Sequence, residues 1–178
     1  MFRKLLNSEL GRLSKEEFRK KKRLPVVIVL DNIRSQHNIG AAFRSADAFC
    51  AQSIFLCGIC SVPPSPEIHK SALGAEESME WNYFEKTEDA IIKLKHDGYR
   101  ILSVEQTENS TMLNNLVLSE NEKYAFVFGN EVKGVAQEIA DISDLVVEIP
   151  QSGTKHSINV SVSIGIVLWE AARMLKGI

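Results

Sequence analysis

Polar side chains and glycines that could carry chemistry gather in three short segments of the chain. These segments span residues 32–40, 129–134 and 150–159, and an apolar stretch precedes each of them. Such a cluster after three separate apolar stretches indicates a ligand site better than any single segment does. We therefore expect the three segments to meet at one pocket.

The first segment offers a cationic group that suits a phosphodiester. Asn38 can cap the helix expected to follow, Gly40 permits a close backbone approach, and Arg44 comes four residues later. A guanidinium presents a planar fork of donors that matches phosphate oxygens. Taken alone, however, an arginine at this place in a helix is more often a surface ion-pair residue.

The other two segments offer backbone and small polar groups. Gly129 and Gly134 flank a strand-to-helix turn and would let a ligand touch backbone amides, but their spacing matches neither GxGxxG nor the phosphate-binding P-loop. In the third segment a strand ends at Pro150, and Ser157 and Asn159 stand where a helix begins. Their side chains can satisfy backbone N–H groups that lack a helical partner.

Hydrophobic patterns predict the elements that position these segments. Val26–Leu30 is a continuous branched run of the kind found in strands covered on both faces, and Asn38–Phe49 has the apolar spacing of a helix. Further strands are predicted at Ile54–Leu56, Glu80–Phe84, Arg100–Val104, Ala125–Phe128 and Leu145–Ile149, and further helices at Glu67–Glu77, Thr87–Asp97, Val135–Ala140 and about Ile158–Leu175.

This alternation predicts an α/β fold with a mainly parallel sheet and helices on both of its faces. Ligands of such sheets bind beyond the C-terminal ends of the strands, which is where the three polar segments fall. A length of 178 residues with 44% hydrophobic content favours a single compact domain. No apolar run is long enough to span a bilayer and no signal peptide is recognisable, so we expect a cytoplasmic protein.

Charge is distributed unevenly along the chain. Residues 1–24 carry nine Lys or Arg against three Asp or Glu, whereas the remainder carries 12 against 20. Ser14 to Glu17 fits a capping box that opens a short helix, and Pro25 ends the basic region. We therefore divide the chain into a basic helical arm, residues 1–24, and a body, residues 25–178. The arm can neutralise phosphates, although a solvated helix end is an equally simple explanation.

The cysteines favour packing rather than metal binding. Cys57 and Cys60 form a CxxC pair, but a structural zinc site normally needs a second pair, and the chain has only one more cysteine. Cys57 ends a buried strand, where a free thiol behaves as a small hydrophobe. We expect no metal, and free thiols fit a reducing compartment.

Taken together, the three segments resemble the motifs of SpoU/TrmH-type RNA 2′-O-ribose methyltransferases of the SPOUT superfamily. The matching residues are Asn38, Gly40 and Arg44; then Gly129, Glu131 and Gly134; then Ile149, Pro150, Gly153 and Ser157 to Ser161. They occur in the family's order and span nearly the whole body. Two departures are Gln151, where methionine is usual, and Ile158, where leucine is usual. We expect no separate N-terminal RNA-binding domain of the kind that many ribosomal-RNA members carry.

The resemblance implies a C-terminal trefoil knot whose loops bind S-adenosyl-L-methionine. It implies cofactor contacts at Gly129, Gly134, Ile149, Gly153 and Ile158. It also implies a homodimer with the last helix at the interface, for which Ile164, Ile166, Val167, Leu168, Trp169 and Met174 offer apolar surface. The same residues could instead fill the core of a monomer.

The resemblance assigns Arg44 the activating role in catalysis, as a base or as an electrostatic clamp. A clamp demands less, because a guanidinium rarely gives up its proton. Asn38, Glu131, Ser157 and Asn159 would orient Arg44, the ribose and the loops. For contacts to RNA we predict Arg34 and the run Arg19, Lys20, Lys21, Lys22 and Arg23.

The RNA substrate stays open between tRNA, which the small size favours, and ribosomal RNA. A non-catalytic RNA-binding module that keeps the fold is the competing class. A dinucleotide-dependent dehydrogenase is disfavoured, because the glycine fingerprint and the ribose-binding acid are lacking.

Overall fold

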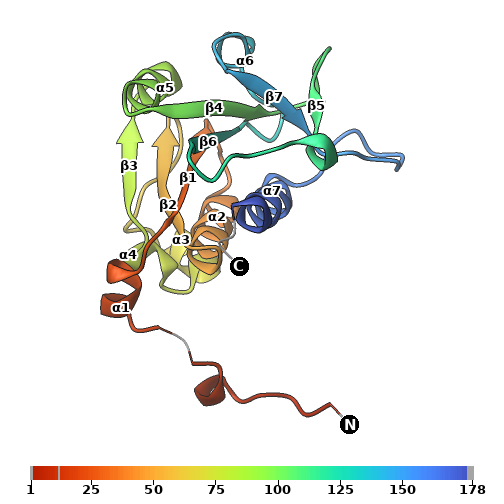
Figure 1. Cartoon of the computed structure of the whole chain (residues 1–178). Helices are drawn as coiled ribbons and strands as arrows, with labels where there is room; N and C mark the ends of the chain where they lie inside the picture. The colour runs from red at the N-terminus through yellow and green to blue at the C-terminus, as the bar shows by residue number, and fades with distance from the viewer. Residues whose placement is uncertain (1, 12, 176–178) are drawn as a thin grey trace.

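A parallel sheet forms the centre of the protein. The computed structural model describes residues 2–11 and 13–175, and the side chains of Asn7, Lys15 and Arg19 lie outside the described part. The described residues form a seven-stranded sheet in the order β3-β2-β1-β6-β4-β7-β5, and every strand pair is parallel (Figure 1). The strands are β1 (Leu24–Asp31), β2 (Ala51–Cys57), β3 (Trp81–Phe84), β4 (Tyr99–Val104), β5 (Thr111–Met112), β6 (Lys123–Phe128) and β7 (Leu145–Glu148).

Helices cover both faces of the sheet, as predicted. On one side lie α1 (Lys15–Lys20), α2 (Gln36–Ala48), α3 (Pro66–Ala72), α4 (Ala75–Ser78) and α7 (Val160–Met174). On the other lie α5 (Thr87–His96) and α6 (Gln137–Asp141). No helix in the described residues is long and apolar enough to cross a membrane.

The position of the central strand β1 between two helical layers explains why its sequence is apolar throughout. Val26, Ile28 and Leu30 are buried in the core that contains α2 and α7, whereas Val27 and Val29 are buried in the core that contains α5 and α6. Successive side chains of a strand point to opposite faces, so two helical layers require an apolar residue at every position. Each such side chain contributes about 1.5–3 kcal/mol when it is fully buried.

Several predicted boundaries need correction. The helix predicted at Glu67–Glu77 is two helices, because Leu73 and Gly74 adopt left-handed conformations with φ of 54° and 92° and end α3. The last helix begins at Val160 with Asn159 as its N-cap, not at Ile158. Strand β5 was missed, since two residues are too short to show a pattern. The helix after β1 is capped by Ser35, whose hydroxyl accepts from the Asn38 amide at 3.3 Å, and not by Asn38.

Three of the six apolar residues that we expect at a dimer interface on the last helix are buried in the chain's own core. Ile164, Val167 and Leu168 are buried there. Ile166 and Met174 are partly buried, and Trp169 is 54% exposed.

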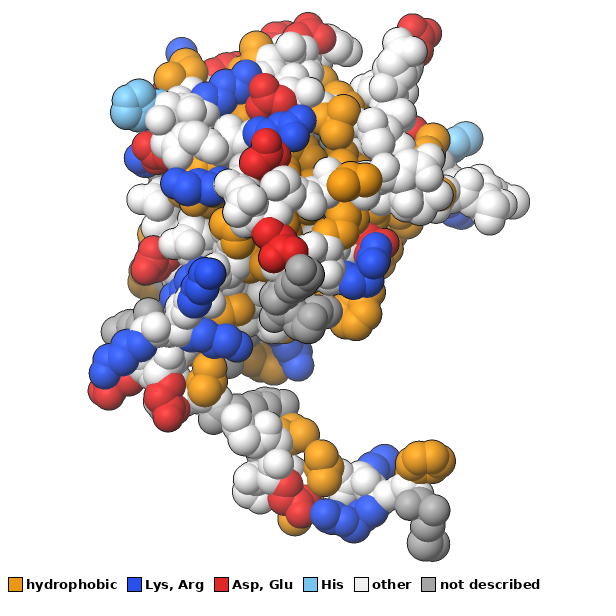
Figure 2. Space-filling view, viewed as in Figure 1, with side chains coloured by type: hydrophobic (Ala, Val, Ile, Leu, Met, Phe, Trp, Pro, Cys, Tyr) orange, Lys and Arg blue, Asp and Glu red, His pale blue; other side chains and the backbone are white. Residues whose placement is uncertain are grey.

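The N-terminal arm is attached to the body through α1. The predicted capping box is present, with Ser14 and Glu17 each accepting from the other's backbone amide. Phe18 is buried against the core, and the Arg23 guanidinium lies 4.6 Å above its ring centroid. The residues before α1 extend away from the body, and Lys and Arg side chains cluster where the two parts join (Figures 1 and 2).

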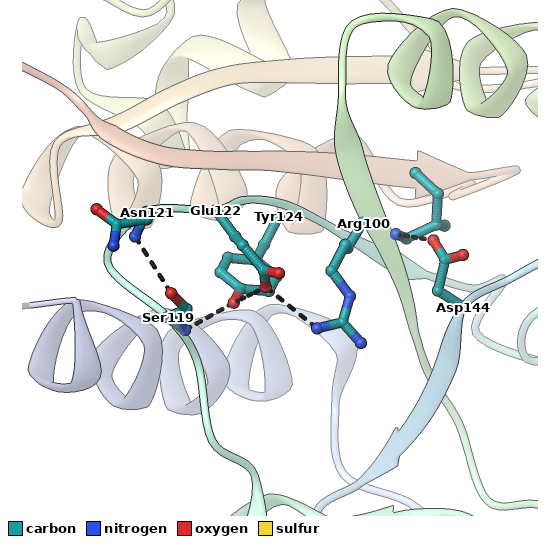
Figure 3. A network of polar contacts seen from close by, with 7 residues as sticks. Arg100, Ser119, Asn121, Glu122, Tyr124 and Asp144 are labelled. Atoms are coloured by element: carbon teal, nitrogen blue, oxygen red, sulfur yellow. Dashed lines mark hydrogen bonds and ion pairs between the residues drawn. The ribbon is translucent and has the colours of Figure 1, made fainter.

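A polar network holds the N-terminal ends of the strands together (Figure 3). The Glu122 carboxylate accepts from Arg100 Nη1 at 3.1 Å and from the Tyr124 hydroxyl at 2.7 Å, and the Tyr124 hydroxyl accepts from the Ser119 amide. Asp144 accepts from the Ile101 amide at 2.7 Å. Hydrogen bonds from Tyr124 and then Arg100 lower the pKa of Glu122, so the network persists at neutral pH. It lies at the opposite ends of the strands from the pocket described next.

Candidate functional site

The main pocket opens beyond the C-terminal ends of β4, β6 and β7. Its volume is about 460 Å³, within the range of roughly 300–1,000 Å³ typical of small-molecule sites. The lining comes from three stretches of chain, namely Val104 to Gln106, Phe128 to Gly134, and a third containing Ile149, Gln151 and residues 156 to 160 with Ser163. The second and third predicted segments therefore share one pocket.

The first segment is tied to this pocket by Glu131. Its carboxylate accepts from the backbone amides of Arg34 and Ser35, each at 3.1 Å, and from the side-chain amide of Asn38 at 3.1 Å. The neighbouring Asn130 donates to the Asn32 carbonyl at 2.7 Å. These bonds join residues more than 90 positions apart in the chain.

Hydrogen bonding keeps Glu131 ionised. Desolvation by burial alone would raise its pKa, but the bonds from its own amide, Arg34, Asn38 and Ser35 together outweigh that effect. The net result is a pKa below the ordinary value for glutamate. Glu131 is thus an anionic anchor that holds two loops together.

Asn38 connects all three segments. It donates to Glu131 and accepts from the side-chain amide of Asn159 at 3.4 Å. Asn159 also caps α7 by accepting from the Ser161 amide at 2.9 Å. These contacts confirm that the three segments meet, but only the second and third of them line the pocket.

Tight backbone packing explains both glycines of the second segment. A Cβ on Gly129 would lie 2.0 Å from the Gly134 carbonyl carbon and from the Val135 nitrogen. Gly134 has a φ of 70°, and a Cβ there would lie 2.1 Å from a carboxylate oxygen of Glu105. The glycines are therefore needed to close the loop on itself, not only to admit a ligand as the sequence suggested.

Glu105 is a site residue that sequence reasoning missed. One oxygen accepts from the Val135 amide at 2.8 Å and the other from the Gln106 amide at 2.8 Å. Gln106, Asn130, Lys133 and His156 also line the pocket and were not predicted. Their position in the sequence could have identified them, because Glu105 and Gln106 directly follow a predicted strand, where ligands of parallel sheets bind.

The remaining predicted site residues fall into two groups. The pocket is lined by Ile149, Ser157 and Ile158, together with Gly129 and Gly134. Gly153 does not line the pocket, and a Cβ built on it would have no neighbouring atom within 4 Å. Arg44 is exposed on the outer face of α2 and lies outside the pocket lining. Its guanidinium has no partner among the described residues.

The residues predicted to contact RNA differ in whether their side chains are free to bind it. Lys20, Lys21, Lys22 and Arg34 are exposed, and the side chain of Arg19 lies outside the described part. The Arg23 guanidinium donates to the Ala51 carbonyl at 3.3 Å and packs on Phe18, so the fold already uses it.

The cysteines are packing residues. Cys57 and Cys60 are buried free thiols, and Cys60 accepts from the Ile33 amide and donates to the Leu30 carbonyl. Burial is the largest influence on Cys60 and raises its pKa to about 11. A thiol in this state is a poor nucleophile at neutral pH.

Replacing Gly129 by alanine should disrupt the second segment. The added methyl group must displace the Gly134–Val135 backbone, and overpacking of this kind costs about 1–3 kcal/mol. Urea unfolding will measure the loss. The control Gly153→Ala adds the same methyl group to open space and should change the free energy of unfolding by less than about 0.5 kcal/mol. Equal stability of both variants would contradict the packing argument.

Replacing Glu131 by glutamine should destabilise the protein in a pH-dependent way. Because the folded-state pKa is lowered, the carboxylate's contribution is fully present above the unfolded pKa of about 4.3 and is lost as the pH falls through the folded pKa. Glu131→Gln should therefore be less stable than the parent at pH 7. The gap, measured by thermal unfolding, should narrow progressively as the pH falls below about 4.3, and a gap independent of pH would refute the anchor role.

Comparisons with known proteins identify the family of this chain. Residues 25–169 match the SpoU rRNA Methylase family. The chain is 30% identical over 172 residues to a tRNA (guanosine(18)-2′-O)-methyltransferase of Aquifex aeolicus, covering 95% of this chain and 78% of that protein. It is 32% identical over 149 residues to the 23S rRNA (guanosine-2′-O-)-methyltransferase RlmB of Neisseria meningitidis, covering 84% of this chain but only 58% of that protein.

Solved structures show the same fold. An rRNA methyltransferase from Sinorhizobium meliloti with bound AdoMet superposes with a TM-score of 0.79 at 27% identity, covering 89% of this chain and 60% of that chain. The A. aeolicus TrmH/SpoU tRNA modifying enzyme also gives a TM-score of 0.79, at 24% identity, covering 91% of this chain and 82% of that chain. By the match over residues 25–169 and these relatives, the chain belongs to the SpoU rRNA methylase family.

Proposed function

We propose that this protein is an S-adenosylmethionine-dependent RNA 2′-O-ribose methyltransferase that acts on a guanosine in tRNA. The observation that carries the proposal is a pocket lined by the second and third motifs, to which Asn38 ties the first motif through Glu131 and Asn159. Two of the relatives are named as guanosine 2′-O-methyltransferases, one of tRNA and one of 23S rRNA.

The pocket fits S-adenosylmethionine, which supplies an electrophilic methyl group on a sulfonium. Its size suits a small molecule, its wall combines apolar Ile149 and Ile158 with the exposed backbone of the second segment, and polar groups surround its rim. We assign Gly129, Gly134, Ile149 and Ile158 to cofactor binding. The trefoil knot would lie in the same loops, and Gly153 has room to approach the ligand from the third loop.

Arg44 would hold the RNA rather than the cofactor. It lies outside the pocket lining on the solvent side of α2, and a free guanidinium there can grip a phosphate next to the reacting ribose. Positioning the hydroxyl in line with the methyl group can contribute roughly 7–11 kcal/mol to catalysis. Asn38, Glu131, Ser157 and Asn159 would then act by holding the loops and the ribose.

The proposal includes a homodimer formed through α7. Val162, Ile166 and Trp169 form a stripe along α7 in which Val162 is 51% and Trp169 is 54% exposed. Trp169 packs edge-on against Phe49 at the end of α2, with ring centroids 6.2 Å apart. A second copy covering this stripe would place Arg44, on α2, at the subunit interface.

The basic arm would add non-specific affinity for RNA. Exposed Lys20, Lys21 and Lys22 can neutralise phosphates, as can Arg34 on the first segment. In this proposal residues 1–24 form the arm and residues 25–178 form the methyltransferase domain of a cytoplasmic enzyme. Ribosomal RNA is the second candidate substrate, favoured by the similarity to RlmB.

The proposed reaction is tested by cofactor binding and by mapping the product. Calorimetry should detect binding of S-adenosylmethionine to the purified protein. Ribose methylation mapped across total RNA from a deletion strain should be lost at one guanosine, and the purified protein should restore it. Loss in 23S rRNA instead of tRNA would select the second substrate. No cofactor binding would leave only a non-catalytic RNA-binding module.

Replacing Arg44 by alanine should remove activity while sparing the cofactor. Loss of one group that stabilises the transition state costs about 10²–10³-fold in kcat, and the cofactor pocket does not contain Arg44. Methyl transfer and calorimetry will separate the two effects. The control Arg100→Ala removes an arginine that binds Glu122 at the far end of β4, so it should lower stability slightly but keep full activity in the folded protein. Wild-type turnover in Arg44→Ala would disprove the assignment.

Replacing Trp169 by glutamate should dissociate the dimer. A charge within an apolar interface is costly unless it is paired. Light scattering after size exclusion should give twice the chain mass of 19.9 kDa for the parent and a single chain for Trp169→Glu. Ile92→Glu places the same charge at a 64% exposed apolar residue of α5, and this variant should stay dimeric. A monomeric parent protein would refute the interface.

A further inference from the structure

The proposed reaction requires a group that accepts the proton of the ribose hydroxyl. The titratable side chains that line the pocket are Glu105, Glu131, Lys133 and His156. Each can be weighed by the hydrogen bonds that it already makes, because a base needs an available lone pair within reach of the substrate.

The two carboxylates are already engaged. Both oxygens of Glu105 accept from backbone amides, those of Gln106 and Val135. Both oxygens of Glu131 accept from donors of the first segment, and its pKa is below the ordinary value. A carboxylate stabilised by such donors is a weak proton acceptor.

The two cations are equally unsuitable. Lys133 carries an ammonium group, which has three donors and no acceptor. Arg44 carries a guanidinium that does not lose its proton in proteins, and it lies outside the pocket lining.

His156 has the free acceptor that the others lack. It lines the pocket on the segment between β7 and α7, directly before Ser157, and its side chain is exposed. Its imidazole makes no hydrogen bond or ion pair with any described residue. A neutral imidazole has one nitrogen that donates and one that accepts, and histidine is the commonest general acid–base residue.

We infer that His156 is the general base that takes the proton of the ribose 2′-hydroxyl. The inference rests on the proposed function. As the 2′-oxygen forms its bond to the methyl carbon, the carbon–sulfur bond breaks and leaves its electron pair on sulfur, and the hydroxyl proton moves to the free ring nitrogen. The positive charge of the sulfonium is thereby replaced by that of the imidazolium, which later releases its proton to water. Arg44 keeps the separate task of holding the phosphate.

The test compares His156→Gln with Lys155→Ala. Lys155 is an exposed neighbour on the same segment that does not line the pocket. Single-turnover methyl transfer to the target RNA is measured across pH, and the dissociation constants for S-adenosylmethionine and RNA are measured separately by calorimetry and filter binding.

His156→Gln should slow methyl transfer by about 10²–10⁴-fold. The rate of the parent should fall toward acidic pH, as it does for reactions that need an unprotonated base, and His156→Gln should lose that fall. Both dissociation constants should stay within about two-fold of the parent, and Lys155→Ala should match the parent throughout. Added imidazole should partly restore His156→Ala.

Other outcomes overturn the inference. A parent-like rate and pH profile in His156→Gln shows that another group accepts the proton. A loss explained by weaker cofactor or RNA binding makes His156 a binding residue instead. Failure of the proposed function is distinguished because the parent itself would then bind no S-adenosylmethionine or methylate no RNA.

Discussion

The Glu131 carboxylate is the interaction on which the site depends. It accepts from two backbone amides and one side-chain amide of the segment that leads into α2, although that segment lies more than 90 residues away in the chain. Without it, the hydrogen bonds left between the described residues of these two regions would be those of Asn130 to Asn32 and of Ala136 to Asp31. Asn38 extends the connection to Asn159, so one exposed but fully hydrogen-bonded carboxylate organises all three motifs.

The parallel sheet makes this convergence possible. Strands β1, β6, β4 and β7 are neighbours and run in one direction, so the segments that follow them emerge at one edge. The opposite edge carries the network of Glu122, Tyr124 and Arg100, which joins the strand starts and takes no part in the pocket. The pocket and this network thus lie at opposite ends of the same strands.

The charged groups around the pocket divide into anchors and groups free to act. Glu105 and Glu131 have both oxygens engaged by the fold, which makes them structural. Arg44 and His156 have no partners among the described residues, one on the outer face of α2 and one in the pocket wall. The proposed phosphate clamp and the proposed proton acceptor therefore lie at separate places in one subunit. In the proposed dimer, formed through the exposed stripe of α7, the two groups would come together.

By itself, the sequence determined the succession of strands and helices along the chain, apart from β5 and the break between α3 and α4. It also determined the division of β1 between two cores and the three segments that meet at the site. These follow from local patterns, since apolar runs, Pro150 and the glycines act on their immediate neighbours. The tertiary structure alone decided which polar groups are paired. The partners of Glu105 and Glu131 lie about 30 and 97 residues away, and no local pattern encodes them. It also decided that Gly129 must be glycine to admit the backbone of Val135, that Ser35 caps α2, and that Arg44 lies outside the pocket lining. Close packing and hydrogen bonding between distant segments are properties of the folded chain, which is the physical reason that they could not be predicted from the sequence.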